Sequence, residues 1–522
     1  MDKKNYIGLT IGPLYRTLTS VKQTRELWGA SYIFSYIMKK MVEKLKNGKK
    51  FVIPYTGDDQ IFQAGKEVGL FHDRFIFEAG TDDFDKVIKV KNEVLNEIAK
   101  KINKEDNDNV FNFLDKYFQI YFCEMEIEGD YKAANNEINQ YLDSLELQSK
   151  FIKKEGQKNK QGQNPLFELF DRVNSSFLVE DAFGEKKRHS FLSIPEIAAL
   201  KQKYDKNKDK CELNWEGITP SPKKKDSENE KNNSKSEYDV DDSNIYEQLI
   251  KNNPNTFKQY HKYIAIVQAD GDNLTSTINE LNSNADFGKL SKALLDFSLE
   301  AHKAVSDYGG LTIFAGGDDI LFFAPVISGE QSVFDLVDNL GKIFKDKFEK
   351  FENPPTLSAG ISITYYKYPM GEALENAADL LFNKAKNFEG KNAVAFEVEK
   401  HSGQNFSGVF NKSSGEYKTF QKLIKCNSKE EMLTSLIHKL NLHKAVVELI
   451  GKDETSLKNY FTNFFNESEH DKFKELIDLT AEFVNKIHLS VRKTEKPEEE
   501  IMEKTKLIDS VLRLKKFMGG ER

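Results

Sequence analysis

Alternating and continuous apolar runs divide the second half of the chain into strands and helices. The run KYIAIVQADGD (262–272) predicts a buried strand that ends in acidic residues, and a helical pattern follows over 275–307. LTIFAGGDDILFFAPV (311–326) then has two apolar runs around a short turn, which is typical of a hairpin. The pattern continues with helices over 332–351 and 371–390 and strands over 355–367 and 392–398. This βαββαβ order, with an extra helix and strand, predicts a ferredoxin-like domain.

A weaker version of the same order occupies the first half of the chain. The expected elements are strands over 6–14 and 117–127, helices over 24–46 and 84–102, and a hairpin-like segment FVIPYTGDDQIF over 51–62. We therefore predict an α+β fold with two ferredoxin-like domains and additional helical domains. The first domain is the degenerate copy.

The remaining segments are mainly helical or polar. Residues 130–203 have a mainly helical pattern, whereas 204–244 is so poor in aliphatic residues that we expect most of it to be disordered or a long loop. The tail 409–522 carries apolar stripes typical of a helical bundle. The predicted domains are 1–150, 151–256, 257–400 and 401–522.

Composition limits the class of protein further. The 522 residues are 39% hydrophobic, which is enough for three or four domain cores. A net charge of −7 argues against a chain that coats nucleic acid by itself, although local basic grooves or nucleic acid held by partner subunits remain compatible. Cys123, Cys211 and Cys426 are too few and too scattered for a disulfide framework or a four-cysteine zinc site. With no membrane-length apolar run and no signal peptide, we expect a cytoplasmic protein.

The hairpin at 311–326 has two adjacent carboxylates, Asp318 and Asp319, at its turn. A turn needs glycine and at most one Asp or Asn, so a second carboxylate adds repulsion unless a cation lies between them. Asp270 ends the preceding strand, 48 residues before Asp318, and in a ferredoxin-like sheet that strand lies beside the hairpin. We therefore expect the three carboxylates to meet at one edge of the sheet.

Such a cluster suits hard divalent cations, Mg²⁺ or Mn²⁺. Two ions about 4 Å apart activate a 3′-hydroxyl and stabilise the leaving pyrophosphate of a nucleoside triphosphate. The glycines of this region, Gly271, Gly316 and Gly317, are expected to let the backbone approach the nucleotide. Lys386 and Lys391 are candidates for neutralising the β- and γ-phosphates, although lysines near a helix end are often simply solvated.

Other acidic and histidine motifs are weaker candidates. Asp58 and Asp59 imitate the hairpin, but the strand expected at 6–14 offers no carboxylate to converge on them. His-Asp pairs at 72–73 and 470–471 lack the further ligands that a metal-dependent phosphohydrolase needs. We attribute both pairs to chance.

Four segments together resemble a known family. ADGDNL (269–274) and AGGDDI (315–320) match the catalytic pair of nucleotidyl cyclase palms, and 11–38 resembles the N-terminal palm of the large subunit of type III-B (Cmr-type) CRISPR effector complexes. GLFHDRFIF (69–77) is similar to that family's Leu-Pro-Asn-Arg-Phe element, with His72 and Asp73 in place of Pro and Asn.

The resemblance implies a target-RNA-activated signalling subunit that makes an adenylate messenger, such as a cyclic oligoadenylate or a related AMP conjugate, from ATP. Its partners would be other Cmr-type subunits, crRNA and target RNA. By resemblance, Asp270 and Asp318 would bind metal, Asp319 would assist at the metal or the attacking hydroxyl, and Asp272 would support the loop.

Two departures and several alternatives remain. The chain opens at the palm without an HD nuclease pattern, so we expect no DNase activity, and the family's cysteine-rich zinc motif is missing. A catalytically minor scaffold subunit is the main alternative. A diguanylate cyclase is disfavoured because Ile320 stands where GGDEF has Phe, and a templated polymerase because no basic groove is evident. The identity of the adenylate product stays open.

The helical tail is expected to form a bundle that also docks a small helical subunit and displaced target RNA.

Overall fold

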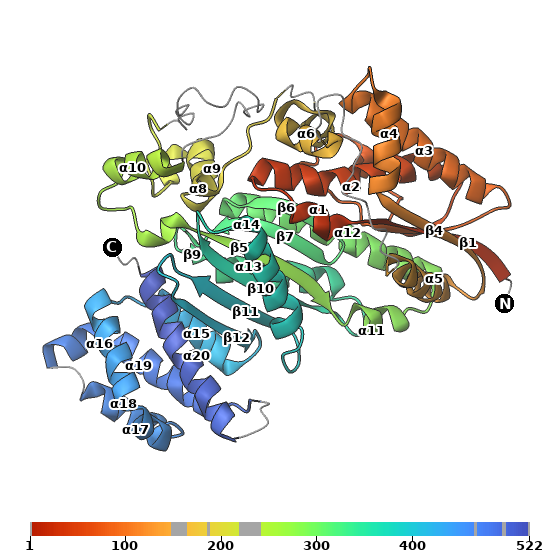
Figure 1. The fold of residues 1–522 in the computed structure, drawn as a ribbon. Coiled ribbons are helices and arrows are strands. Elements are labelled where there is room, and N and C mark those ends of the chain that lie inside the picture. Colours follow the sequence, from red (N-terminus) through yellow and green to blue (C-terminus); the bar gives the residue numbers. More distant parts are fainter. Residues whose placement is uncertain are drawn as a thin grey trace.

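In the part of the chain that the structure describes, the main elements are two large β-sheets with their covering helices and a C-terminal helical bundle, and the expected α+β class is confirmed (Figure 1). The computed structural model describes residues 3–147, 164–184, 188–218, 242–463, 467–492 and 497–519. In the described part of the chain, no helix is long and apolar enough to cross a bilayer.

The first sheet has the antiparallel order β2-β3-β1-β4 that a ferredoxin-like fold requires. Its strands are β1 (Lys3–Gly12), β2 (Phe51–Ile53), β3 (Arg74–Glu78) and β4 (Gln119–Glu128). Its helices are α1 (Leu14–Leu18), α2 (Thr24–Leu45), α3 (Asp83–Ile102), α4 (Asn107–Tyr117) and α5 (Tyr131–Glu146). Helix α2 is buried on nearly all sides, because it also packs against a strand of the second sheet.

The prediction of a hairpin over 51–62 is wrong. Strand β2 ends at Ile53, and the chain then makes a short 3₁₀ helix, Asp59–Phe62, in which the Asp58 side chain accepts a hydrogen bond from the backbone N–H of Gln60 at 2.8 Å. The strand that pairs with β2 is β3, part of the 69–77 element. An Asx cap is therefore found where the similarity to the 311–326 hairpin predicted a tight turn.

The second sheet has six strands in the order β12-β11-β10-β5-β7-β6, and all its pairs are antiparallel except β10 with β11. The strands are β5 (Tyr263–Asp272), β6 (Leu311–Gly316), β7 (Asp319–Pro325), β10 (Thr356–Tyr365), β11 (Ala393–Glu399) and β12 (Asn405–Asn411). Strand β12 lies in the segment assigned to a helical domain, so that assignment is wrong for these residues. A small ribbon, β8 (Ile327–Ser328) with β9 (Gln331–Ser332), follows β7.

Helices cover both faces of the second sheet. One face carries α12 (Asn284–Tyr308) and α13 (Val333–Phe348), and the other carries α14 (Met370–Asp379) followed by a π-helical turn, Leu380–Ala385. The helix expected over 275–307 is in fact two helices, because Ser283 caps α12 after the short α11 (Leu274–Asn279). Alternation along β5 therefore directs Asp270 and Asp272 to the α14 face and Gly271 to the α13 face.

The middle region consists of short helices. They are α6 (Pro165–Asp171), α7 (Phe177–Phe183), α8 (Ile194–Ala198), α9 (Lys201–Lys206) and α10 (Asp242–Asn252). Of these, α6 and α7 pack against α2 of the first domain, and α8 packs against β5 and β7 of the second sheet, with α9 and α10 beside α8. Residues 204–206 lie in α9, contrary to the expected loop, whereas 211–218 do form a loop, in which Leu213 and Trp215 are buried against Tyr246 and Leu249 of α10. The rest of that prediction, 219–241, lies outside the described residues.

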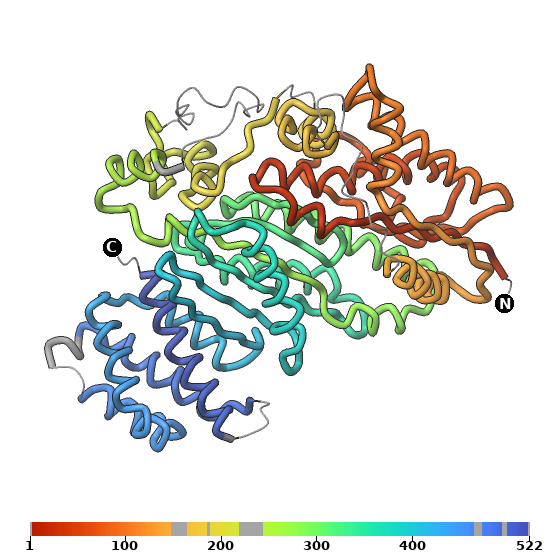
Figure 2. Tube along the Cα trace, in the orientation of Figure 1, coloured from red at the N-terminus to blue at the C-terminus, as the bar shows by residue number. Residues whose placement is uncertain are grey.

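The C-terminal helices gather at the opposite end of the molecule from the first sheet (Figure 2). They are α15 (Gly415–Lys425), α16 (Glu430–Leu442), α17 (Lys444–Ile450), α18 (Glu454–Thr462), α19 (Glu467–Leu489) and α20 (Pro497–Met518). Their apolar stripes form one core that continues into the second sheet, as the period of the tail predicts.

Gly360 sets how closely α14 and the π-helical turn approach β10. A Cβ at this position would overlap the carbonyl oxygen of Ala377 and the backbone nitrogen of Leu381. Gly360→Ala should therefore lower the thermal unfolding midpoint, with a cost of about 1–3 kcal/mol for the forced backbone shift.

Gly288→Ala is the matched control for Gly360→Ala. Gly288 lies in α12 with open space around its missing Cβ, so the same substitution should leave the midpoint unchanged or raise it slightly. Differential scanning calorimetry of both variants would contradict this view of the sheet if Gly360→Ala melted with the wild type.

Candidate catalytic site

The three aspartates singled out in the sequence meet at one end of the second sheet. Asp270 lies on β5, Asp318 lies in the turn between β6 and β7, and Asp319 begins β7, which pairs directly with β5. Asp319 and Asp270 share a side-chain hydrogen bond, and a Cβ built on Gly271 would lie 2.7 Å from Oδ2 of Asp318. Gly271 therefore provides the space that brings Asp318 against β5.

Burial and mutual repulsion dominate the electrostatics of this cluster. The pKa of Asp318 rises to about 7, because the side chain is desolvated and lies beside Asp270. Desolvation, the hydrogen bond with Asp270 and the nearby charges of Asp270 and Asp318 also raise the pKa of Asp319 well above its usual value. Both effects favour the protonated forms of Asp318 and Asp319 over their carboxylates in the absence of a cation.

Asp272 has a different environment, because its carboxylate is fully buried and hydrogen-bonded. Its Oδ2 accepts hydrogen bonds from the hydroxyls of Thr356 and Ser358, both at 2.8 Å, and from the backbone N–H of Asn392 at 3.0 Å. These bonds tie the end of β5 to the starts of β10 and β11. The geometry is that of a supporting residue.

Both candidate lysines lie at this edge of the sheet. Lys386, directly after the π-helical turn, forms ion pairs with Asp270 and, at 3.4 Å, with Asp272, and it also donates to the carbonyl of Gly271. Lys391 donates to the side chain of Asn273 at 3.1 Å. Lys386 is thus inside the acidic cluster, whereas Lys391 stands beside the loop that follows β5.

The first domain contributes a wall to the site that the sequence analysis missed. The imidazole of His72 lies over Gly317, so close that a Cβ there would overlap the ring, and Gly317 also has φ +68°. Burial lowers the pKa of His72 to about 4 and raises that of Asp73 to about 6, and the charge of Asp73 acts on Asp319. The His-Asp pair that we attributed to chance therefore packs against the acidic turn.

Asp58 and Asp59 of the first domain, which resemble the acidic pair of the hairpin in sequence, form no such cluster. The Asp58 side chain caps the 3₁₀ helix, and Asp59 forms an ion pair with Lys46 while remaining 85% exposed. For the second His-Asp pair, 470–471, the side chains lie outside the described residues.

The donor set fits a divalent cation, although the side chains are not arranged around one. Within the described ranges, no group of three or more His, Cys, Asp and Glu side chains has the geometry of a metal centre. Lys386 instead pairs with Asp270, and the raised pKa of Asp318 records repulsion that this single ammonium leaves uncompensated. Oxygen-only ligands with excess negative charge are what Mg²⁺ and Mn²⁺ bind.

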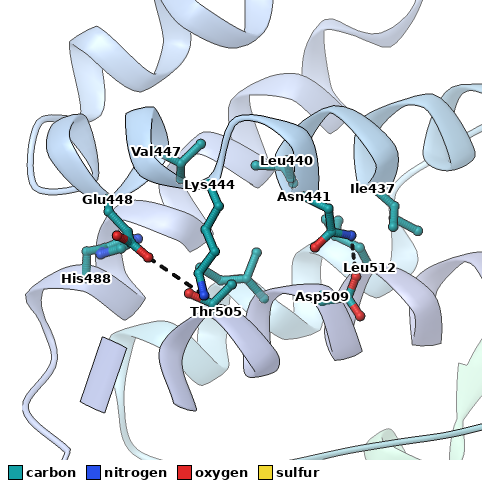
Figure 3. Close-up of a pocket in the computed structure, with 11 residues that line it drawn as sticks. Ile437, Leu440, Asn441, Lys444, Val447, Glu448, His488, Thr505, Asp509 and Leu512 are labelled. Atoms are coloured by element: carbon teal, nitrogen blue, oxygen red, sulfur yellow. Dashed lines mark hydrogen bonds and ion pairs between the residues drawn. The ribbon is translucent and has the colours of Figure 1, made fainter. Parts of the chain in front are cut away.

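A pocket in the C-terminal bundle is too small for a nucleotide (Figure 3). Its volume is about 20 Å³, room for a water molecule, between the apolar sides of Ile437, Leu440 and Leu512. Asn441 donates to Asp509 at 3.1 Å across its mouth. We interpret it as a packing gap between α16, α17 and α20.

Family models match both halves of the chain. The model for the second palm domain of Cas10/Cmr2 matches residues 263–395, and that for the N-terminal region of the CRISPR-associated protein Cmr2 matches 6–110. A 116-residue stretch, 22% of this chain, is 42% identical to the CRISPR system Cmr subunit Cmr2 of Pyrococcus furiosus. That stretch spans only 13% of the Pyrococcus protein.

Solved structures share the fold over the whole chain. A type III-B Cmr-beta complex bound to cognate target RNA contains a chain that matches with a TM-score of 0.54 and 12% identity, over 100% of this chain and 83% of that one. A chain of the Csm1–Csm4 cassette in complex with cA3 matches with a TM-score of 0.51 and 14% identity, over 99% and 70%. With a family model on each of its two sheets and a stretch 42% identical to a Cmr2 subunit, the chain belongs to the Cas10/Cmr2 family.

Proposed function

We propose that the chain is an ATP-dependent nucleotidyltransferase that makes an adenylate second messenger. The convergence of Asp270, Asp318 and Asp319 carries this proposal, because three buried carboxylates at one edge of a sheet repel one another unless a cation lies between them, and the pKa values of Asp318 and Asp319 are raised. In the reaction, a 3′-hydroxyl oxygen attacks the α-phosphorus of ATP, a phosphodiester bond forms, and pyrophosphate leaves. The product is a cyclic oligoadenylate or a related AMP conjugate.

Each residue of the site has a proposed role. Asp270, Asp318 and Asp319 would hold two Mg²⁺ or Mn²⁺ ions, which supply Lewis-acid activation of the hydroxyl and charge stabilisation at the phosphates. Asp319, on which the charge of Asp73 acts, would accept a proton from the attacking hydroxyl. Asp272 keeps the end of β5 in place, and Gly271, Gly316 and Gly317 leave room for the side chains of Asp318, Phe314 and His72 respectively, rather than for a nucleotide.

The lysines would bind the triphosphate. Lys386 now neutralises Asp270, and when divalent ions take over that task its ammonium is free to reach the β- and γ-phosphates. Lys391 lies beside the loop after β5, where we propose that it contacts the terminal phosphate, and Gly390 with φ +77° lets the chain turn there.

The assembly we propose is an RNA-guided antiviral complex. The partners are other Cmr-type subunits, crRNA and target RNA, and target-RNA binding activates synthesis. Support comes from the relatives: the matching Cmr-beta structure is bound to cognate target RNA, and the matching cassette structure contains cA3. We further propose that the chain has no HD-type nuclease activity, because its His72–Asp73 pair is committed to the acidic turn.

A scaffold subunit is the second candidate. The ion pair between Lys386 and Asp270 favours it, since a lysine in the cluster keeps the fold intact without metal. Turnover of ATP separates the two candidates.

Replacing both hairpin aspartates should abolish catalysis. We expect Asp318→Ala/Asp319→Ala to lower adenylate synthesis by at least about a hundredfold, because the ligands that position the ions are lost. The measurement uses the complex assembled with crRNA and target RNA, α-labelled ATP, Mg²⁺ or Mn²⁺, and mass spectrometry of the products.

Asp58→Ala/Asp59→Ala is the matched control, since it removes the same two side chains from the imitation motif. It should keep wild-type synthesis. Equal loss in both double variants, or no product from the intact wild-type complex with target RNA bound, would contradict the proposed enzyme.

Lys386 and Lys384 allow a similar comparison for the triphosphate. Lys386→Met should raise KM for ATP about tenfold through the loss of a charge-assisted hydrogen bond, with a smaller effect on kcat. Lys384, exposed on the same π-helical turn, provides the control Lys384→Met, which should leave KM unchanged. Initial rates measured against ATP concentration give KM for each variant. Equal KM values for Lys386→Met and Lys384→Met would refute the role of Lys386.

A further inference from the structure

A strongly basic cavity lies on the opposite side of Asp272 from the catalytic carboxylates. It has a volume of about 710 Å³, which is within the usual range for small-ligand sites, and it lies between α13, the junction of β12 with α15, and the start of β10. Five lysines and one aspartate line it, namely Lys342, Lys345, Lys412, Lys418, Lys422 and Asp338.

Lys412 forms the base of this cavity. Its Nζ lies 2.8 Å from the point where a Cβ on Gly341 would be, so the glycine in the middle of α13 leaves the space that the ammonium occupies. Because glycine destabilises a helix interior relative to alanine, this space is a specific feature of α13. Burial lowers the pKa of Lys412 to about 8, while the charges of Asp338 and Asp272 oppose the shift.

The positive charge in the cavity is not balanced by the chain itself. Among the described residues, none of the five lysines has an ion-pair partner. Asp338 is already engaged, because it accepts hydrogen bonds from Tyr417 at 2.8 Å and from Gln421 at 2.7 Å. Four lysines are exposed around the rim, with Lys412 below them. An excess of four charges in one concave site matches a polyphosphate better than a single phosphodiester.

The cavity is separated from the catalytic carboxylates by Asp272. Thr356 and Asn392 line the cavity, and both donate to Oδ2 of Asp272, whereas Lys386 lies on the catalytic side of the same carboxylate. A ligand that contacts Thr356 or Asn392 would therefore touch the residues that hold the end of β5.

We propose that this cavity is a second anion site, which binds the polyphosphate group of a small ligand, either inorganic polyphosphate or a nucleoside triphosphate. Lys412 donates to the ligand at the base, and the four rim lysines neutralise its remaining charge. Binding at this cavity is independent of the reaction proposed above, because it uses neither the catalytic carboxylates nor a divalent ion.

Calorimetric titration of the full chain with tripolyphosphate in metal-free buffer tests this site. Wild-type protein should bind saturably, and Lys412→Gln should weaken binding about tenfold, the usual effect of losing one charge-assisted hydrogen bond. Gly341→Ala keeps every charge but displaces the ammonium, and it should weaken binding to a similar extent. Lys303→Gln removes an exposed lysine of α12 and should leave affinity unchanged.

Further arms identify the ligand and separate this site from the catalytic one. ATP binding much more tightly than tripolyphosphate would identify a nucleotide as the ligand, and equal affinity would identify the phosphate chain alone. Wild-type affinity in Lys412→Gln, or loss of binding in Asp318→Ala/Asp319→Ala, would overturn the proposal. So would Lys412-dependent binding of a short single-stranded RNA without any binding of tripolyphosphate, because the surface would then contact nucleic acid.

Discussion

Repulsion among the carboxylates of Asp270, Asp318 and Asp319 is the constraint around which the centre of the molecule is arranged. Pairing of β5 with β7 forces these groups together, and burial prevents water from screening them. Lys386 supplies one positive charge, which it pairs with Asp270. The backbone also needs a glycine at position 271, because only the absence of a Cβ lets Asp318 lie against β5.

The duplicated domain takes part in this arrangement without carrying the acidic cluster. Its strand order repeats that of the second sheet, but its hairpin has become a capped 3₁₀ turn and its acidic pair faces solvent. Instead, the loop before β3 places His72 over Gly317 and Asp73 near Asp319. One copy thus provides the carboxylates, and the other closes the space beside them.

Much of the second domain could be predicted from sequence because its apolar runs are long and regular. The β5, β6–β7 and β10 strands and the convergence of three aspartates follow from local pattern plus ferredoxin-like topology, whereas the family was predicted from the resemblance of four segments to known motifs. Strand β12 was missed because its sequence NFSGVFN is short and half polar, and it is held by pairing with β11. The burial of Leu213 and Trp215 was missed because the residues that they pack against, in α10, lie beyond a long polar stretch of sequence. The position of His72 depends on contact between two domains, which no local pattern encodes.

Binding of Mn²⁺ to the purified chain, followed by electron paramagnetic resonance with a non-hydrolysable ATP analogue present, tests most directly whether the carboxylate cluster exists to hold cations. The account predicts saturable binding at two sites about 4 Å apart. It also predicts that Asp318→Ala/Asp319→Ala abolishes this binding while Asp58→Ala/Asp59→Ala preserves it. Wild-type protein that binds the nucleotide but no Mn²⁺, or that loses nothing when Asp318 and Asp319 are replaced, would contradict it.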